Sequence, residues 1–329
     1  MRRGTGNPDT LAGVRAMLRI FYATDVHGSE VCWRKFLNAG PFHKADVLIL
    51  GGDMTGKAIV PIVRNGGMWE TMLQDHHFAM ETDEEVQAME KRIINRGYYP
   101  VRVTREELAE MNADPKLVER MFKDVMLETV DRWMDIAQEK LAGKDLPCFV
   151  CPGNDDIFEV DDVIAKSTVV EMGEARTVDF GGFSMVSMGW TNPTPWKTYR
   201  EAPEEKLRVR IDRMLEKAPD YRRTIFNFHA PPFGSNLDEA PALDEDMKFV
   251  SGGRALRPVG SKAVREAIME YQPLMSLHGH IHESKGGVRL GKTLAVNPGS
   301  AYEEGVLQAA IIELDPKKAK VKNYILVNG

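Results

Sequence analysis

The sequence of 329 residues has few cysteines and no excess of basic charge. Its three cysteines, Cys32, Cys148 and Cys151, are an odd number, which excludes a complete disulfide framework and is typical of a reducing compartment. Cys148 and Cys151 have C-x-x-C spacing, but they lie inside an apolar strand pattern, and no second pair follows. We therefore interpret them as small buried side chains and not as a redox or zinc site.

Long apolar runs are also missing. No run approaches the roughly 20 residues that a membrane span requires, and no apolar stretch follows the basic N-terminus as it would in a secretory signal. We therefore expect a cytoplasmic protein without membrane contact. The formal net charge of -6 disfavours a general nucleic-acid binder, because such proteins present a basic face. Residues 1–16 are expected to be a disordered lead, or to precede a true start at Met17.

What the chain does have is a recurring pattern of short apolar runs. Runs of strand length cover residues 18–24, 46–50, 147–151, 224–228 and 273–277. Segments with helical periodicity cover residues 30–38, 204–217 and 261–271. This alternation predicts an α/β fold. Since sites in open α/β sheets form outside the carboxyl ends of the strands, the loops that follow these runs should share one edge.

These loops carry carboxylate, amide and imidazole groups. The residues are Asp25, His27, Asp53, Asn154, Asp155, Asp156, His229, His280 and His282. Such groups bind divalent metal ions. A bridging carboxylate can hold two cations about 3.5–4 Å apart, and a water held between them becomes a nucleophile near neutral pH. For any single loop, hydrogen-bonded surface histidines are the alternative interpretation.

His280 and His282 flank Ile281 at the end of the last of these runs. On an extended backbone, side chains two positions apart point the same way, so we expect both imidazoles to face one site.

Residues 56–146 differ in character from the rest of the chain. Charged segments with helical periodicity cover 81–96, 104–111 and 115–141, and Thr104 with Glu107 has the pattern of a capping box. We interpret 56–146 as a helical insertion, either a lid or a dimerisation interface, within one domain of residues 17–329. His76 and His77 in it are interpreted as exposed polar residues, with a substrate or accessory metal contact as the alternative. The long loop 234–260 is expected to be functional.

The ordered motifs Asp25-x-His27, Gly52-Asp53, Gly153-Asn154-x-Asp156, His229 and Gly279-His280-x-His282 resemble those of the calcineurin-like metallophosphoesterases. They extend from residue 25 to 282 and thus over most of the chain. The resemblance implies a two-sheet α/β sandwich flanked by helices. It also implies two divalent metal ions, manganese, iron or zinc. One ion would lie on Asp25, His27, Asp53 and His282, and the other on Asp53, Asn154, His229 and His280.

The chain departs from this family at Asp155. The family has a histidine there, which protonates or stabilises the leaving group. Asp155 could act as a general acid at low pH, serve as an extra ligand, leave a catalytic gap, or face away from the site. Asp155 and Asp156 are the candidate catalytic residues. The resemblance also suggests that His278 supports the ligands and that the turn 297–300 is structural, with Gly299 supplying its backbone conformation.

The leading hypothesis is a dinuclear metal phosphodiesterase in which water attacks phosphorus directly. Its substrate is expected to be a phosphorylated small molecule, because the acidic balance disfavours a nuclease. A catalytically weak metal-site scaffold for protein interaction is the rival from another class, motivated by Asp155 and by the large insertion. No organic cofactor is expected, and the insertion is the segment through which a homo-oligomer would form.

Overall fold

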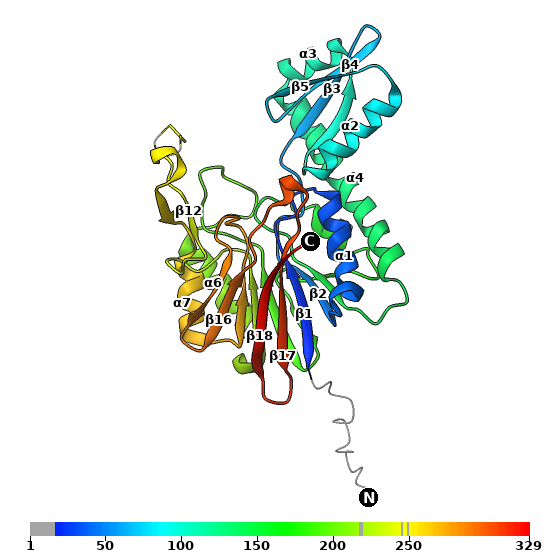
Figure 1. The fold of residues 1–329 in the computed structure, drawn as a ribbon. Helices are drawn as coiled ribbons and strands as arrows, with labels where there is room; N and C mark the ends of the chain where they lie inside the picture. Colours follow the sequence, from blue (N-terminus) through cyan, green and yellow to red (C-terminus); the bar gives the residue numbers. More distant parts are fainter. Residues whose placement is uncertain (1–16, 217–219, 245, 249) are drawn as a thin grey trace, which may run out of the picture.

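Two six-stranded sheets packed face to face form the body of the molecule in this computed structural model, which describes residues 17–216, 220–244, 246–248 and 250–329 (Figure 1). The expectation for residues 1–16 lies outside the described residues. The first sheet is ordered β18 (Lys320–Asn328), β17 (Gln308–Asp315), β1 (Leu18–Ala23), β2 (Val47–Leu50), β7 (Cys148–Val150) and β8 (Glu171–Met172). The second is ordered β15 (Gly286–Leu290), β16 (Thr293–Asn297), β14 (Met275–Leu277), β11 (Thr224–Phe228), β10 (Phe183–Met188) and β9 (Thr177–Phe180).

Strand β1 shows how the apolar sequence divides between two cores. Ile20 and Tyr22 pack into the core between the two sheets, whereas Phe21 and Ala23 pack on the opposite face against helices. Side chains of a strand alternate between faces, so a strand buried on both sides has no polar position to spare. This explains the apolar run from Ile20 to Ala23, and the charged Arg19 lies where the strand is only half-buried.

Helices cover the outer face of each sheet. Helices α1 (Glu30–His43), α4 (Pro115–Leu141) and α5 (Val160–Ile164) pack on the first sheet, and α6 (Glu204–Leu215) and α7 (Lys262–Tyr271) pack on the second. Trp33 of α1 stacks on Trp133 of α4 with ring centroids 5.0 Å apart. The expected two-sheet α/β sandwich flanked by helices is therefore confirmed.

The prediction that residues 56–146 are helical is wrong for part of this segment. Strands β3 (Ile59–Asn65), β4 (Met68–Leu73), β5 (His76–Met80) and β6 (Tyr99–Val103) form a separate sheet in the order β5-β4-β3-β6. Asn65 pairs with Met68 across a two-residue Gly66–Gly67 turn, which is a hairpin signal present in the sequence. Ile59, Val60, Ile62 and Val63 also favour a strand.

The small sheet and its helices form a unit with its own apolar core. Helix α2 (Asp83–Asn95) buries Val86, Met89 and Ile93 against Ile62 of β3. Helix α3 (Arg105–Ala113) then leads into α4. In Figure 1 this unit stands beyond the end of the sandwich at which β1 finishes. Helix α4 belongs to the body, because it packs against α1 and the first sheet.

The side chains at the N-terminal ends of three helices differ in whether they cap their own helix. Thr104 and Glu107 form the predicted capping box of α3, and the Ser261 hydroxyl accepts a hydrogen bond from the Val264 amide at the start of α7. Ser29 lies at the N-cap position of α1, but its hydroxyl donates to the Asn95 carbonyl at 2.7 Å. This hydroxyl therefore makes no cap bond within its own helix and joins α1 to the end of α2.

The remaining elements are short. The segment 234–260 contains the antiparallel pair β12 (Glu239–Pro241) and β13 (Leu256–Pro258), so it is not entirely a loop. Short 3-10 turns cover Tyr221–Arg223, Val250–Gly253 and Tyr302–Glu304. Across the described ranges, no helix combines the length and the apolar character that crossing a membrane would take.

Strand direction determines where the loops gather. Strands β1, β2 and β7 run parallel in the first sheet, and β11, β14 and β16 run parallel in the second. The carboxyl ends within each sheet therefore lie on one edge, and the two edges meet at the same end of the sandwich. Every loop with a predicted ligand leaves its strand at this end.

Candidate metal centre

The loops after β1, β2, β7, β11 and β14 bring carboxylates and imidazoles of both sheets into one cluster. It contains overlapping groups whose ligand atoms lie within 4.8 Å of one another. These groups are Asp25, His27 and His282; Asp53, His229 and His280; and His27, Asp53 and Asp155. The sequence-predicted residues therefore do converge in space, although they lie on loops that are far apart in the chain.

Asp53 occupies the middle of the cluster. Its Oδ2 lies 3.2 Å from His229 Nε2 and 3.7 Å from His27 Nε2, so one oxygen faces imidazoles of both groups. Asp25 Oδ1 lies 3.3 Å from His282 Nε2. A carboxylate in the position of Asp53 is suited to share two cations.

Unpartnered polar atoms test whether metal ions fit this cluster. Both ring nitrogens of His229 and the side-chain oxygen of Asn154 are buried without a hydrogen-bond partner among the described residues. The 3.2 Å contact of His229 with Asp53 lacks the alignment of a hydrogen bond. A buried polar atom without a partner costs about 1–3 kcal/mol. A cation bound to the Asn154 oxygen and to the Nε2 atom of His229, which faces Asp53, would remove that cost for these two atoms.

The orientation of Asn154 agrees with this fit. Its amide nitrogen donates to Asp155 Oδ1 and to Thr198 Oγ1, each at 2.9 Å. These two bonds use the donor side of the amide and leave its carbonyl oxygen as the free acceptor. Amide and carboxylate oxygens with imidazole nitrogens form a donor set that suits divalent manganese, iron or zinc.

The negative charges of the buried carboxylates also favour the binding of cations at the cluster. Burial lowers the pKa of His229, but the carboxylates of Asp53 and Asp25 outweigh it and raise this pKa to about 9. Burial alone raises the pKa of Asp53, yet the charge of His229 holds it well below its usual range. Burial lowers the pKa of His280 to about 4, which keeps this imidazole neutral and able to act as a ligand.

Several of these side chains depend on an uncommon backbone conformation. Asp25, His27, Asp53 and His280 have φ values of 53°, 37°, 49° and 68°. Residues other than glycine adopt this left-handed region at a cost of about 1–3 kcal/mol, and such strain gathers at functional sites. The fold thus holds four of the residues that approach the cluster in strained conformations.

The strain at His280 corrects one prediction. The stretch after β14 is not extended, so His280 and His282 do not face one site through strand alternation. They enter two different ligand groups instead. Gly279 lies so close to Asp25 and Thr24 that a Cβ would not fit there. This close approach lets the His280 amide donate to the Asp25 carboxylate at 3.1 Å.

Asp156 is fully buried and holds two of the loops together. Its carboxylate accepts hydrogen bonds from the Gly153 amide at 2.7 Å, the Thr55 amide at 2.8 Å and the Thr55 hydroxyl at 2.7 Å. The Met54 amide donates to it as well. These bonds join the loop after β2 to the loop after β7. Asp156 therefore positions Asp53 and Asn154, and its predicted catalytic role stays a prediction.

Arg200 is a supporting residue that sequence reasoning missed. It is buried, and its guanidinium donates to the carbonyls of Asp156 at 3.0 Å and Ile157 at 3.1 Å. It also pairs with Asp161 at 2.6 Å. Nothing in the local sequence marks it, because it stands in a Pro-rich loop far from the motifs.

His278 and Asn297 have the surroundings that the sequence suggested. His278 contacts the Phe228 carbonyl at 2.8 Å and the Ser276 hydroxyl at 2.6 Å, and so fixes the strand that carries His229. Asn297 donates to the Ile281 carbonyl at 2.9 Å and accepts from the Gly299 amide. Gly299 has a φ of 73°, as a structural turn at this position requires.

Asp155 faces the cluster. Its carboxylate pairs with Lys57 and lies 3.8 Å from His27 Nδ1, and its amide donates to Asp53 Oδ1 at 2.9 Å. The alternative in which it faces away is thus wrong. Burial and the Asp53 charge raise its pKa to about 6 against the opposing effect of Lys57. Sequence reasoning missed Lys57, since a single lysine at the start of the insertion belongs to no motif.

The two histidines of the insertion lie elsewhere. His76 and His77 are exposed on β5, and His77 Nε2 lies 4.0 Å from Glu70. This geometry favours the interpretation of both as surface residues.

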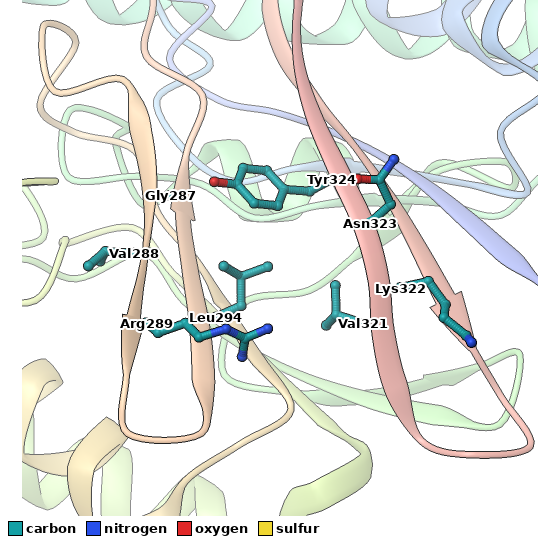
Figure 2. A pocket seen from close by; sticks show the side chains of 8 residues that line it. All are labelled: Gly287, Val288, Arg289, Leu294, Val321, Lys322, Asn323 and Tyr324. Atoms are coloured by element: carbon teal, nitrogen blue, oxygen red, sulfur yellow. The ribbon is translucent and has the colours of Figure 1, made fainter.

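A cavity of about 310 Å³ lies between β15, β16 and β18 (Figure 2). Figure 2 shows the Tyr324 and Leu294 side chains between these strands. None of its lining residues belongs to the candidate metal centre. A larger cavity of about 500 Å³ does reach the centre, through Lys57.

Comparison with known proteins agrees with this fold. No family model matches the chain. The uncharacterized protein MJ1162 of Methanocaldococcus jannaschii is 28% identical over 149 residues, which are 45% of this chain. The chain spans 61% of the length of that relative. The crystal structure of TT1561 of Thermus thermophilus aligns over 95% of this chain and 98% of its own, with 16% identity and a TM-score of 0.52.

The chain has the two-sheet fold that the metallophosphoesterase resemblance implied. A phosphatase structure from Mycoplasma pneumoniae aligns over 95% of this chain and 93% of its own, but only with 12% identity and a TM-score of 0.44. That similarity is too loose to transfer an activity.

Replacing Asp156 should show how strongly the centre depends on this carboxylate. Asp156→Ala leaves three buried amides and a hydroxyl without their acceptor, at about 1–3 kcal/mol for each unpaired group. We expect the free energy of unfolding, measured by urea denaturation in a chelating buffer, to fall by about 3 kcal/mol or more. Asp162→Ala on the exposed side of α5 is the control and should change it little. Equal stability of the two variants would refute the role given to Asp156.

Proposed function

We propose that this protein is a metal-dependent phosphodiesterase of the calcineurin-like metallophosphoesterase superfamily that hydrolyses a small phosphodiester. The observation that carries the proposal is the pair of ligand groups around Asp53, with the unpartnered atoms of His229 and Asn154 beside it. The motif resemblance and the fold support the same assignment.

The residues divide into two ligand sets that share Asp53. Asp25, His27 and His282 complete one set, because their ligand atoms lie together on one side of Asp53. Asn154, His229 and His280 complete the other, because His229 contacts Asp53 and the oxygen of Asn154 has no other partner among the described residues. A bound pair of divalent ions would supply an activated water and offset the charge of the phosphate.

The residues around the ligands favour a diester over a monoester. Asp155 places a carboxylate, and not an imidazole, beside Asp53. A monoester carries more negative charge than a diester and is repelled more strongly by this carboxylate. Lys57, whose side chain is 39% exposed, supplies a cation at the rim but is already paired with Asp155. A diester with a good leaving group needs less help from a proton donor.

Asp53→Asn should abolish turnover while it leaves the fold intact. The change keeps the size of the side chain but removes the charge that both ligand sets share. We expect hydrolysis of bis(p-nitrophenyl) phosphate, measured with added manganese, to fall by more than about 100-fold, because even residues that only support ligands cost about 10–100-fold. Asp75→Asn, an exposed change in the insertion, is the matched control. Turnover within a few-fold of the parent in Asp53→Asn would overturn the shared-ligand assignment.

Assays of the wild-type protein distinguish the three hypotheses from the sequence, which are a small-molecule phosphodiesterase, a nuclease and a scaffold. Turnover of the activated diester without degradation of DNA supports the proposed small-molecule enzyme. Degradation of DNA with a steep salt dependence would identify a nuclease. If neither substrate is hydrolysed, the scaffold for protein interaction is the hypothesis that remains.

Asp155→His should raise monoester hydrolysis. The imidazole replaces a repelling carboxylate with a group that can donate a proton to the leaving oxygen, an effect of about 100-fold or more in favourable geometry. We expect a gain of at least about tenfold in kcat/KM for p-nitrophenyl phosphate, with a smaller change for the diester.

Asp155→Asn separates the two causes of this gain. It removes the negative charge without supplying a proton donor. A gain that appears in Asp155→His alone supports the imidazole as the missing group. An equal gain in both variants assigns the effect to charge, and no gain in either shows that position 155 does not limit monoester hydrolysis.

A further inference from the structure

The cavity of about 500 Å³ beside the candidate metal centre has mostly apolar walls. It lies where β3 and the segment before it face α3 and the start of α4. Ile59 lines one side, Leu108 and Met111 line a second, and Val118 and Phe122 line a third. Ligand pockets of small molecules have volumes of about 300–1,000 Å³ and predominantly apolar linings. The cavity is therefore large enough for an organic group of two fused rings or a short chain.

Lys57 connects this cavity to the cluster of ligands. It is one of the residues that line the cavity, and its ammonium group contacts the Asp155 carboxylate. Asp155 in turn belongs to a ligand group with His27 and Asp53. A molecule held at the centre could thus reach the cavity by passing a single cationic side chain.

The backbone beside Lys57 is held in place. The Gly56 amide donates to the Tyr99 hydroxyl at 2.7 Å, and the Tyr99 ring packs 5.8 Å from Phe122. These contacts join the floor of the cavity to the loop that carries Asp53. The shape of the cavity is therefore linked to the position of the ligands and is not a gap between independent parts.

From these contacts we infer that the cavity binds the apolar organic substituent of the phosphoester whose phosphate lies at the metal centre. This inference rests on the proposed function and adds the substrate class: a phosphate ester with a bulky apolar group. The occupant follows from the position of the cavity. Its lining includes Lys57, a cation that contacts Asp155 at the centre, where an anionic phosphate would lie, and most of its other walls are apolar.

The other cavities do not offer this combination. The cavity of Figure 2 shares no residue with the centre. A third, of about 420 Å³, lies between α1, α2 and the 302–304 turn, and Lys91, Arg92, Arg96, Glu303 and Glu304 give it charged walls.

Phosphinates test this inference without relying on turnover. A dialkylphosphinate carries the single negative charge of a diester and is not hydrolysed, so its affinity reports where its large substituent lies. The dissociation constants of dimethylphosphinate, methyl(1-naphthylmethyl)phosphinate and methyl(octyl)phosphinate would be measured by isothermal titration calorimetry in manganese buffer. We expect at least one of the two large substituents to bind about tenfold or more tightly than methyl, and the preferred one identifies a ring or a chain.

Two tryptophan variants of α4 locate the binding site. Val118→Trp fills the cavity from a half-buried position and should remove the preference for large substituents without weakening the binding of dimethylphosphinate. Lys116→Trp places the same side chain on the exposed side of the helix and should keep the preference. Circular dichroism and thermal melts would show that both variants fold.

The outcomes separate this inference from the proposed function. If dimethylphosphinate binds but large substituents bind no more tightly, or if Val118→Trp keeps their advantage, the inference about the cavity is overturned. If no phosphinate binds to the manganese-loaded wild type, the proposed function fails first.

Discussion

Two carboxylates, Asp25 and Asp53, are buried among imidazoles where the edges of the two sheets meet, and the rest of the centre is arranged around this burial. Isolated buried charges are very costly unless they are paired or coordinate metal. The protein side chains meet only part of this need. His229 remains without a hydrogen bond on either ring nitrogen, and the oxygen of Asn154 has no partner among the described residues. The proposed pair of divalent ions would offset this charge and would coordinate the Asn154 oxygen and one ring nitrogen of His229.

The surrounding loops maintain this costly arrangement through polar contacts that do not touch the proposed ions. Asp156 joins the loops after β2 and β7, Arg200 holds the carbonyls behind Asn154, and His278 fixes the strand that leads to His229. Left-handed conformations at Asp25 and Asp53 add strain that only such contacts can hold. This explains why so many buried polar residues lie behind the ligands. The substituted position, Asp155, is part of the same network through Asp53 and Lys57.

The sequence predicted the strands and the convergence of their loops for a simple physical reason. Strands buried on both faces leave an unbroken apolar run, and parallel strands place their carboxyl ends on one edge. It did not predict the sheet of the insertion, because β4 and β5 are half-exposed and mix polar with apolar residues. The Gly66–Gly67 turn was the available signal.

Contacts between residues distant in sequence were also beyond prediction. Lys57 and Arg200 act through partners that lie 98 and 44 positions away, so no local pattern marks them. His280 and His282 enter separate ligand groups because His280 has a left-handed backbone conformation. The alternation of side chains would hold only if this loop were extended. Ser29 illustrates the same limit, since its hydroxyl bonds a carbonyl of the insertion and not its own helix.

The central claim is that Asp53 is shared by two metal ions, and anomalous diffraction from manganese-loaded crystals tests it most directly. The protein would be purified without chelator, and its metal content would be measured by mass spectrometry on the same preparation. The account predicts about two ions per chain, separated by about 3.5–4 Å, with Asp53 between them and with Asn154 and His229 on one of them. A single ion bound away from Asp53, or a metal-free centre in manganese-saturated crystals, would contradict it.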